Sequence, residues 1–271
     1  MKVLTSLFFV LAWLPAFSTG LSPQVPADDA AELARKLQNP VASLISVPFQ
    51  ANWDFGIGAN EAMRFTLNVQ PVIPVALSND LNLIVRTIVP VIDAESPAPA
   101  IPHASGVGDI TQSFFFSPKA PTSGGWIWGA GPVLLWPTAT NDLLGGEQWG
   151  TGPTALALRQ SGGWTYGLLA NHLWSYAGED ERTDVNVTFL QPFVSYITKT
   201  KTTFTLNTEA SYDWAGTQWS VPVNVSVSQL FKIGGVPMQF SIGGRYYAEG
   251  PTGGPGWGLR TGLTFLFPKM N

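Results

Sequence analysis

Residues 218–231 constrain the fold of this chain more than any other stretch. The segment runs Gln-Trp-Ser-Val-Pro-Val-Asn-Val-Ser-Val-Ser-Gln-Leu-Phe. Apolar and small polar side chains alternate along nearly all of it, which places them on opposite faces of a β-strand. Strands of soluble proteins average about five or six residues, whereas a tilted strand that crosses a bilayer needs about nine to eleven. We therefore predict that this segment is a membrane-spanning β-strand.

The same pattern repeats along the chain and predicts about twelve strands in all. The other segments are residues 47–55, 63–69, 81–91, 107–117, 126–136, 152–159, 164–176, 185–197, 203–212, 238–247 and 257–267. An even number of strands is typical of bacterial single-chain barrels. The prediction is an all-β fold, a transmembrane antiparallel β-barrel of about 12 strands that occupies residues 47–271, with a short N-terminal helix before it.

Alternation alone does not say which face points outward, because a soluble barrel alternates too, with its apolar face inside. Charged residues make up only 12% of the chain, against roughly 25% in ordinary soluble domains. The face opposite the apolar one consists of Ser, Thr, Asn, Gln and Gly with scattered charges, which is typical of a lumen lining. The 11 tryptophans lie mostly near predicted strand ends, as in the aromatic girdles of membrane barrels. These features favour a membrane barrel over a soluble one.

The N-terminus has the form of a secretory signal peptide over residues 1–20. Lys2 gives the positive start, residues 3–17 are apolar, and small residues follow at Ser18 and Gly20. No cysteine occurs in the chain, so disulfides and thiolate metal sites are excluded. We predict export through a cleaved signal.

Residues 21–46 form a lead that contains one short amphipathic helix, predicted over residues 28–39. Leu33, Ala34 and Leu37 share its apolar stripe, and Pro40 ends it. So short a helix is marginal by itself, which favours docking on the barrel mouth or in the lumen. A frayed periplasmic tail is the alternative, since chain termini are often mobile.

The predicted connections tend to alternate between long and short, which matches the long extracellular loops and short periplasmic turns of outer-membrane barrels. Both termini then lie on the periplasmic side. Three connections depart from the rule: 56–62 and 213–217 are short on the long-loop side, and 71–80 is long on the short-turn side.

Seven charged residues lie on the polar parity of their strands and are the candidates for lumen-lining, solute-selecting groups. An Arg that faces lipid at mid-depth would cost about 2–4 kcal/mol, so these side chains are expected to face inward or to lie at an interface. They form either a charge-lined constriction that selects solutes or a salt-bridge network that fills a narrow lumen. The candidates are Asp54, Arg64, Arg86, Asp109, Glu209, Arg245 and Arg260.

No motif for catalysis, metal binding, a cofactor or nucleic acid stands out. His103 and His172 are the only histidines, and neither has a carboxylate at ligand spacing. His172 lies near an aromatic strand end, a place loosely similar to the catalytic histidine of outer-membrane lipases, but no matching serine motif accompanies it. We predict that the chain is not an enzyme; His172→Ala would test the lipid-enzyme hypothesis. No basic stripe suggests nucleic acid.

Three stretches resemble a family of bacterial outer-membrane barrels, the transporters of the phenol meta-degradation pathway type, some of which are misnamed neuromedin U. They are Asn-Pro-Val-Ala-Ser-Leu-Ile-Ser-Val-Pro-Phe-Gln at 39–50, Gly-x-Gly-Asp-Ile at 106–110 with Phe-Phe-Phe-Ser-Pro at 114–118, and Gly-x-Gly-Pro at 129–132. The resemblance covers roughly residues 33–269. It implies an outer-membrane location and a role in small-molecule uptake, and it supplies no catalytic motif.

The functional prediction is an outer-membrane channel or transporter for small solutes, which could be hydrophobic or aromatic, with the N-terminal helix as a plug or gate. The alternative is a non-conducting structural or binding barrel with a filled lumen. The expected partners are outer-membrane lipid, the barrel-assembly machinery and an unidentified small-molecule solute. The chain ends at Asn271, with its last aromatic residue at Phe267.

Overall fold

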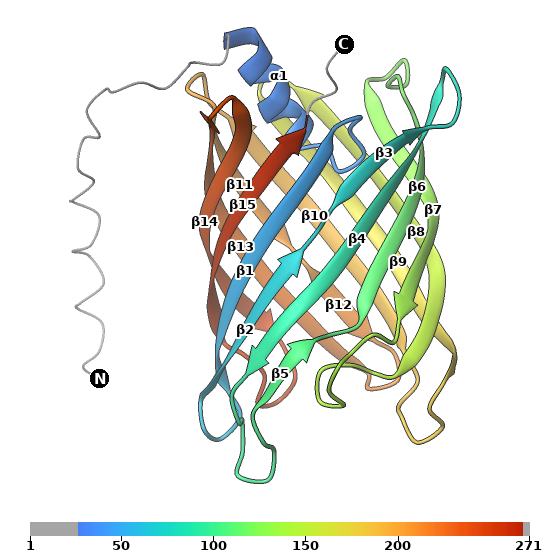
Figure 1. Ribbon diagram of the computed structural model, residues 1–271, viewed down its shortest axis with the longest axis vertical. Coiled ribbons are helices and arrows are strands. Elements are labelled where there is room, and N and C mark those ends of the chain that lie inside the picture. Colours follow the sequence, from blue (N-terminus) through green and yellow to red (C-terminus); the bar gives the residue numbers. More distant parts are fainter. Residues whose placement is uncertain (1–26, 268–271) are drawn as a thin grey trace, which may run out of the picture.

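The structure is a computed structural model that describes residues 27–267. The predicted signal peptide lies outside these residues. One helix, α1 (Ala27–Leu37), precedes a single sheet of antiparallel strand segments (Figure 1). Within residues 27–267, no helix is both long enough and apolar enough to cross a membrane. The strand segments are β1 (Ile45–Ile57), β2 (Ala62–Val69), β3 (Val72–Ala76), β4 (Leu81–Ala94), β5 (Ala104–Val107), β6 (Ile110–Pro118), β7 (Trp126–Trp136), β8 (Gln148–Ser161), β9 (Trp164–Gly178), β10 (Asn186–Ile197), β11 (Thr202–Thr208), β12 (Ala210–Asp213), β13 (Gln218–Ile233), β14 (Val236–Glu249) and β15 (Trp257–Phe267).

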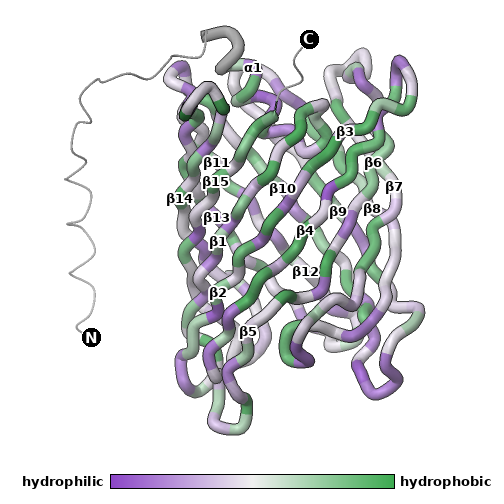
Figure 2. The backbone as a smooth tube through the Cα atoms, in the orientation of Figure 1, coloured by the Kyte–Doolittle hydropathy of each residue, from purple (hydrophilic) through white to green (hydrophobic). Residues whose placement is uncertain are grey.

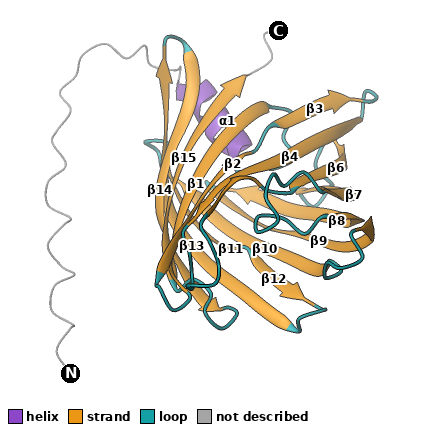
Figure 3. Ribbon diagram, turned by 60° about the horizontal axis from the view of Figure 1, so that its bottom comes forward, coloured by secondary structure: helices purple, strands orange, loops and turns teal. Residues whose placement is uncertain are grey.

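Three pairs of these segments are interrupted halves of one strand, so the barrel has twelve strands. β2 continues into β3, β5 into β6, and β11 into β12, each pair against shared neighbours. β1 pairs with β15 from Ile45↔Phe267 to Phe55↔Trp257, which closes the sheet on itself. Figure 3 shows the strands arranged round one axis. The predicted all-β, twelve-stranded antiparallel barrel with a short N-terminal helix is confirmed.

Prolines explain two of the interruptions. Pro71 separates β2 from β3, and it has no N–H to donate to a ladder. β11 and β12 separate at Glu209, where Pro192 of β10 and Pro222 of β13 lie on the two neighbouring strands. The register is the same on both sides of this break, as Phe193↔Asn207 and Leu190↔Ala210 show. Missing donors therefore interrupt the ladder without shifting the strand.

This arrangement corrects the predicted connection at residues 71–80. Half of it is β3, which pairs with β4, and only residues 77–80 form the turn. The apparent exception to the loop rule therefore disappears. The strand was missed because Pro71 and Pro74 in a short apolar run resemble a loop, although proline fits a strand where no ladder hydrogen bond is needed. β8 also begins earlier than the predicted residue 152, at Gln148.

Loops of unequal length mark the two ends of the barrel. At one end, here called the helix end, lie α1 and the turns at residues 77–80, 119–125, 162–163, 198–201 and 234–235. At the other, the loop end, lie residues 58–61, 95–103, 137–147, 179–185, 214–217 and 250–256. Gly234 and Gly235 show why the shortest turns work: both have positive φ, as a two-residue hairpin turn of type I′ requires.

The barrel is inside-out relative to a soluble protein. Val225 of β13 is 60% exposed and Ile242 of β14 is 53% exposed on the outer face. On the inner face Asn224 is 4% exposed and Arg260 is 8% exposed. Green apolar segments therefore alternate with purple and white ones along the strands in Figure 2. An apolar outer face around a partly polar interior is the arrangement of a membrane barrel.

Aromatic side chains form a belt near each end of the outer face. At the helix end the contacting pairs are Trp126–Tyr166 and Trp164–Tyr196. At the loop end they are Trp136–Trp149, Tyr212–Trp219 and Phe55–Trp257. Two such belts that bracket an apolar band are typical of the interfacial girdles that the sequence predicts.

Candidate functional site

A plug lies at the helix end of the barrel. It consists of α1 and residues 38–44, which follow it. Leu33 and Ala34 of α1 are buried together with Ala42 and Leu44 of the following segment. Leu230 of β13 and Leu266 of β15 belong to the same cluster. Gln160 Nε2 donates a hydrogen bond to the main-chain oxygen of Arg35 at 2.9 Å. The helix therefore docks on the barrel, and does not form a free tail.

Beyond the helix, the plug enters the lumen. Val41 is buried and packs against apolar side chains from β4, β6, β8 and β9. Ser43, two residues after Val41, accepts a hydrogen bond at its Oγ from Asn82 Nδ2 of β4, at 2.7 Å. Gly129 of β7 leaves room for the plug: a Cβ atom there would lie 3.3 Å from Val41 Cγ1. The cluster around Val41 consists of Ile84, Phe115, Leu156, Leu158 and Leu169.

The lumen wall is therefore apolar on one side, which differs from the wholly polar lining that the sequence suggested. The inward side chains of β8 include Leu156 and Leu158, which are buried because they pack on the plug and on each other. Strand alternation identifies two faces but does not show that an inward face is polar. This side of the lumen is apolar because its side chains pack against the N-terminal segment.

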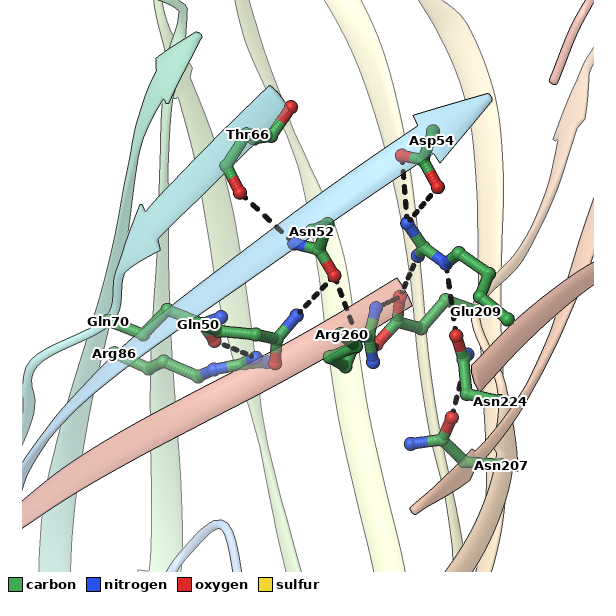
Figure 4. A network of polar contacts seen from close by, with 11 residues as sticks. Gln50, Asn52, Asp54, Thr66, Gln70, Arg86, Asn207, Glu209, Asn224 and Arg260 are labelled. Atoms are coloured by element: carbon green, nitrogen blue, oxygen red, sulfur yellow. Dashed lines mark hydrogen bonds and ion pairs between the residues drawn. The ribbon is translucent and has the colours of Figure 1, made fainter. Parts of the chain in front are cut away.

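The opposite side of the lumen carries an ion-pair network centred on Glu209 (Figure 4). Arg260 binds this carboxylate through two nitrogens, with Nη1 2.9 Å from Oε1 and Nη2 2.7 Å from Oε2. Arg245 donates from Nη2 to Glu209 Oε2 at 2.7 Å. Glu209 lies between β11 and β12, and the two arginines reach it from β14 and β15, which are two and three strands further along the same side of the barrel.

Asp54 and two neutral amide side chains extend this network. Arg245 Nη1 lies 3.2 Å from Asp54 Oδ2, and its Nε donates to Asn224 Oδ1 at 3.0 Å. Arg260 Nε donates to Asn52 Oδ1 at 2.7 Å. Buried polar networks whose members are all bonded are rigid. Sequence reasoning had considered only charges; the amides Asn52 and Asn224 lie on the same strand face and could have been found by that parity.

The seven predicted lumen residues do not act as one group. Asp54, Glu209, Arg245 and Arg260 are brought together in the network. The three residues outside the network are Arg64, Arg86 and Asp109. Asp109 lies at the loop end, where its carboxylate accepts hydrogen bonds from the Ala139 and Gly146 main-chain nitrogens. It holds the loop of residues 137–147 and is separate from the network.

Arg64 and Arg86 face the lumen without an ion pair. Arg64 lies opposite Asp54 in the β1–β2 register, yet no described acid lies within 4.0 Å of it. Arg86 donates from Nη2 to Gln70 Oε1 at 2.9 Å. These four paired and two unpaired residues support the salt-bridge interpretation for one part of the lumen; selection of solutes by any of them stays a prediction.

Two cavities follow one another below the plug. One of about 200 Å³ is bounded by plug residues such as Pro40 and Leu44. The next, of about 350 Å³, reaches Glu209 and Arg260. Gln70, Arg86 and Gln191 line both cavities and therefore lie at the boundary between them. The cavities lead from the plug toward the ion-pair network.

His172 lies on the outer face, because its neighbours Asn171 and Leu173 line the inner cavity. Its Nδ1 is 2.7 Å from Thr188 Oγ1, and its ring centroid is 4.2 Å from that of Trp174. This places it in the aromatic belt. His103 contacts Asp93 at the loop end, with Nε2 and Oδ1 2.6 Å apart. Among residues 27–267, no group of three or more His, Asp or Glu side chains is placed to hold a metal ion.

The chain is similar in structure to an outer membrane channel of Pseudomonas putida F1, with a TM-score of 0.64 and 17% sequence identity over 83% of this chain and 94% of that one. The β domain of the Bordetella autotransporter BrkA gives a TM-score of 0.46, with 9% identity over 83% and 100%. The outer membrane phospholipase of Salmonella typhi gives 0.43, with 10% identity over 89% and 98%. No protein-family profile matches the sequence, and neither does any curated protein. The first likeness supports the barrel fold, and the resemblance to the phenol-pathway family stays a prediction.

Proposed function

We propose that this protein is an outer-membrane channel for small solutes, which its plug holds closed at the helix end. The apolar outer face and the two aromatic belts support a position in a membrane. The short turns and the N-terminal segment lie at the same end, which favours the periplasm for the helix end. Insertion then depends on the barrel-assembly machinery, after export through the predicted signal.

The observation that carries the channel function is the succession of two cavities behind a closure made by one segment. The barrel is complete without that segment, since β1 and β15 form their seam from Ile45 and Phe267 onward. The plug is held by two apolar clusters, one around Leu33 and one around Val41, and by few polar bonds, among them Asn82 to Ser43. A segment that is not part of the sheet is able to move without breaking the strand ladders.

The lumen suits solutes that are partly hydrophobic. The cavity of about 350 Å³ has Ile88, Leu173 and Phe189 in its wall beside the polar groups. Apolar walls with a few placed polar groups are the usual composition of small-molecule sites. Small aromatic or aliphatic solutes are therefore favoured over fully hydrated ones such as sugars.

The test is to lock the plug. The natural chain has no cysteine, so Ser43→Cys with Asn82→Cys introduces the only two thiols. A short bifunctional thiol reagent that joins them should abolish opening in planar-bilayer recordings, and reductive release of a cleavable version should restore it. Each single-cysteine variant treated in the same way is the matched control and should keep opening. A variant that lacks residues 27–43 should conduct continuously.

A non-conducting barrel with a filled lumen is the second candidate, and one observation favours it. The Val41 cluster packs the lumen on its apolar side, and the Glu209 ion pairs lie inside the lumen on the other side. If the variant without residues 27–43 folds as a heat-modifiable barrel but shows no conductance, the channel function fails and the filled barrel stands.

A further inference from the structure

We propose that the larger lumen cavity is a binding site for small organic anions, in which Arg86 pairs with a carboxylate and an apolar wall holds the body of the molecule. The inference rests on the proposed function, because it names the solute class of the same lumen. Among the described residues that line this cavity, Arg86 is the one cation that has no acid at contact distance.

Arg86 differs from the other arginines of the cavity region. Arg260 binds Glu209 through two nitrogens, and Arg245 has both Glu209 and Asp54. Arg86 has only a neutral partner, Gln70, at 2.9 Å. Among the described residues, no Asp or Glu oxygen lies within 4.0 Å of its guanidinium. A charge held away from bulk water is stabilised by an opposite charge, and here the fold supplies none at contact distance.

The acid that lines the same cavity does not fill this role. Glu209 offers one oxygen to Arg245 and both to Arg260, so its hydrogen-bonding capacity faces those two arginines. In Figure 4, Gln70 and Arg86 lie together on one side of the network, whereas Glu209 lies on the other. The guanidinium of Arg86 therefore presents donors to the cavity that the Gln70 bond does not use.

The apolar wall of the cavity determines which kind of ligand body fits beside the carboxylate. Leu173 of β9 and Val187 and Phe189 of β10 line the cavity on the apolar side of the lumen. A volume of about 350 Å³ lies at the lower end of the range for small-molecule sites. Guanidinium geometry suits carboxylates, which accept two parallel hydrogen bonds from it. A compact monocarboxylate with an aromatic or branched aliphatic body fits both walls.

The proposed site lies on the path that a solute would take through the barrel. Arg86, with Gln70 and Gln191, lines both cavities. An anion bound at Arg86 therefore lies at the boundary between the larger cavity and the space under the plug. Rings or single groups of one charge at such a boundary select ions of the opposite sign.

The test is equilibrium dialysis of the full-length protein in detergent against radiolabelled benzoate, with benzyl alcohol and benzylammonium as neutral and cationic counterparts. Dialysis over many hours removes any dependence on how fast the ligand enters. We expect benzoate to bind in preference to both counterparts. Arg86→Gln should weaken benzoate binding about tenfold or more, because the positive charge is lost. Arg86→Lys should retain part of the binding, because an ammonium keeps the charge but cannot donate the two parallel hydrogen bonds of a guanidinium.

Arg64→Gln is the matched control, since it removes an unpaired lumen arginine that lines neither cavity. It should leave benzoate binding within about twofold of the natural protein, because only a distant charge is lost. Heat-modifiability on gels shows whether each variant is folded. Absence of benzoate binding to both the full chain and the variant without residues 27–43 overturns the inference, as does equal binding by folded Arg86→Gln.

The two proposals fail separately. If the plug-deleted variant conducts but does not distinguish benzoate from benzylammonium in binding or reversal potential, the anion site is wrong and the channel stands. If benzoate binds through Arg86 and no form of the protein conducts, the channel is wrong, and the anion site holds as a binding site.

Discussion

At the scale of single residues, Glu209 determines how the polar side of the lumen is arranged. Its carboxylate contacts Arg245 and Arg260, two cations that would otherwise repel each other. Removing one partner of a buried ion pair leaves the other charge uncompensated, which costs more than the net value of the pair. Water in the lumen reduces this cost, because Glu209 is partly exposed.

We therefore expect Glu209→Gln to lower the free energy of unfolding by about 2–3 kcal/mol. Urea titration that follows the compact, unheated gel band measures the change. The double variant Glu209→Gln with Arg245→Gln should recover part of the loss, since one of the stranded cations is gone. Glu181→Gln, in an exposed loop, is the control and should unfold like the natural protein. Equal stability of Glu209→Gln and the control would show that the network contributes nothing.

Gly129 sets the space available to the plug. A Cβ atom at this position would lie 3.2 Å from Phe115 Cβ, 3.3 Å from Ser117 Cβ and 3.3 Å from Val41 Cγ1. Added side-chain atoms in a packed cluster force neighbours to shift, at a cost of about 1–3 kcal/mol. Two of these neighbours are on a strand of the barrel, whereas Val41 belongs to the plug, which is not part of the sheet.

Gly129→Val is therefore expected to displace the plug while the barrel stays folded. Limited proteolysis should cut residues 38–44 faster than in the natural protein, and the heat-modifiable band should remain. Gly244→Val is a matched control, because no atom lies within 4 Å of a Cβ at that outward strand position. Protection of residues 38–44 that is the same in both variants would contradict the close contact at Val41.

At the scale of elements, two loops at the loop end are tied together by one ion pair. Arg182 Nε donates to Glu147 Oε2 at 2.7 Å, and its Nη2 donates to the Asp142 main-chain oxygen at 2.7 Å. The hydrogen bond from Arg182 lowers the pKa of Glu147 below its ordinary value. A lowered folded-state pKa contributes stability above the unfolded pKa, and this contribution disappears as pH falls through the folded value.

The loops should therefore separate in acid. Amide hydrogen exchange of residues 137–147, corrected for the intrinsic effect of pH on exchange, is expected to lose protection as pH falls from about 6 to about 3. Arg182→Gln should show the lower protection at both pH values. A natural protein whose protection does not change over this range would contradict the tie, and a change that Arg182→Gln shares would assign it to another group.

The elements also show what sequence could and could not predict. Alternation along β13 and its counterparts predicted the strand count, because a period of two is a local property. β3 was missed since Pro71 and Pro74 suggest a loop, although β1 and β4 pair with it. Val41 and Leu158 belong to one buried cluster although they are far apart in the chain, and no local pattern predicts such a grouping. The grouping of Glu209 with Arg245 and Arg260 likewise depends on barrel closure.

At the scale of the whole molecule, the distribution of polarity decides the environment in which the barrel is stable. A soluble protein of this shape would need a polar outer face, yet side chains such as Leu206, Phe240 and Leu259 are exposed on it. Lipid would bury these outward side chains, because the strand alternation keeps them away from the plug cluster and from the polar network inside. Stability is thus expected to depend on depth in a bilayer.

Two arginine substitutions on β13 test this dependence at nearly equal exposure. Val225, in the middle of the strand, is 60% exposed, and Ile233, at its end beside a turn, is 63% exposed. In lipid vesicles Val225→Arg should lower the free energy of unfolding by about 2–4 kcal/mol, and Ile233→Arg by about 0–1 kcal/mol, because a lipid-facing charge is costly only near the midplane. Urea unfolding monitored by tryptophan fluorescence measures both. If the outer face were in contact with water, both substitutions would have small and similar effects, and the membrane assignment would have to be abandoned.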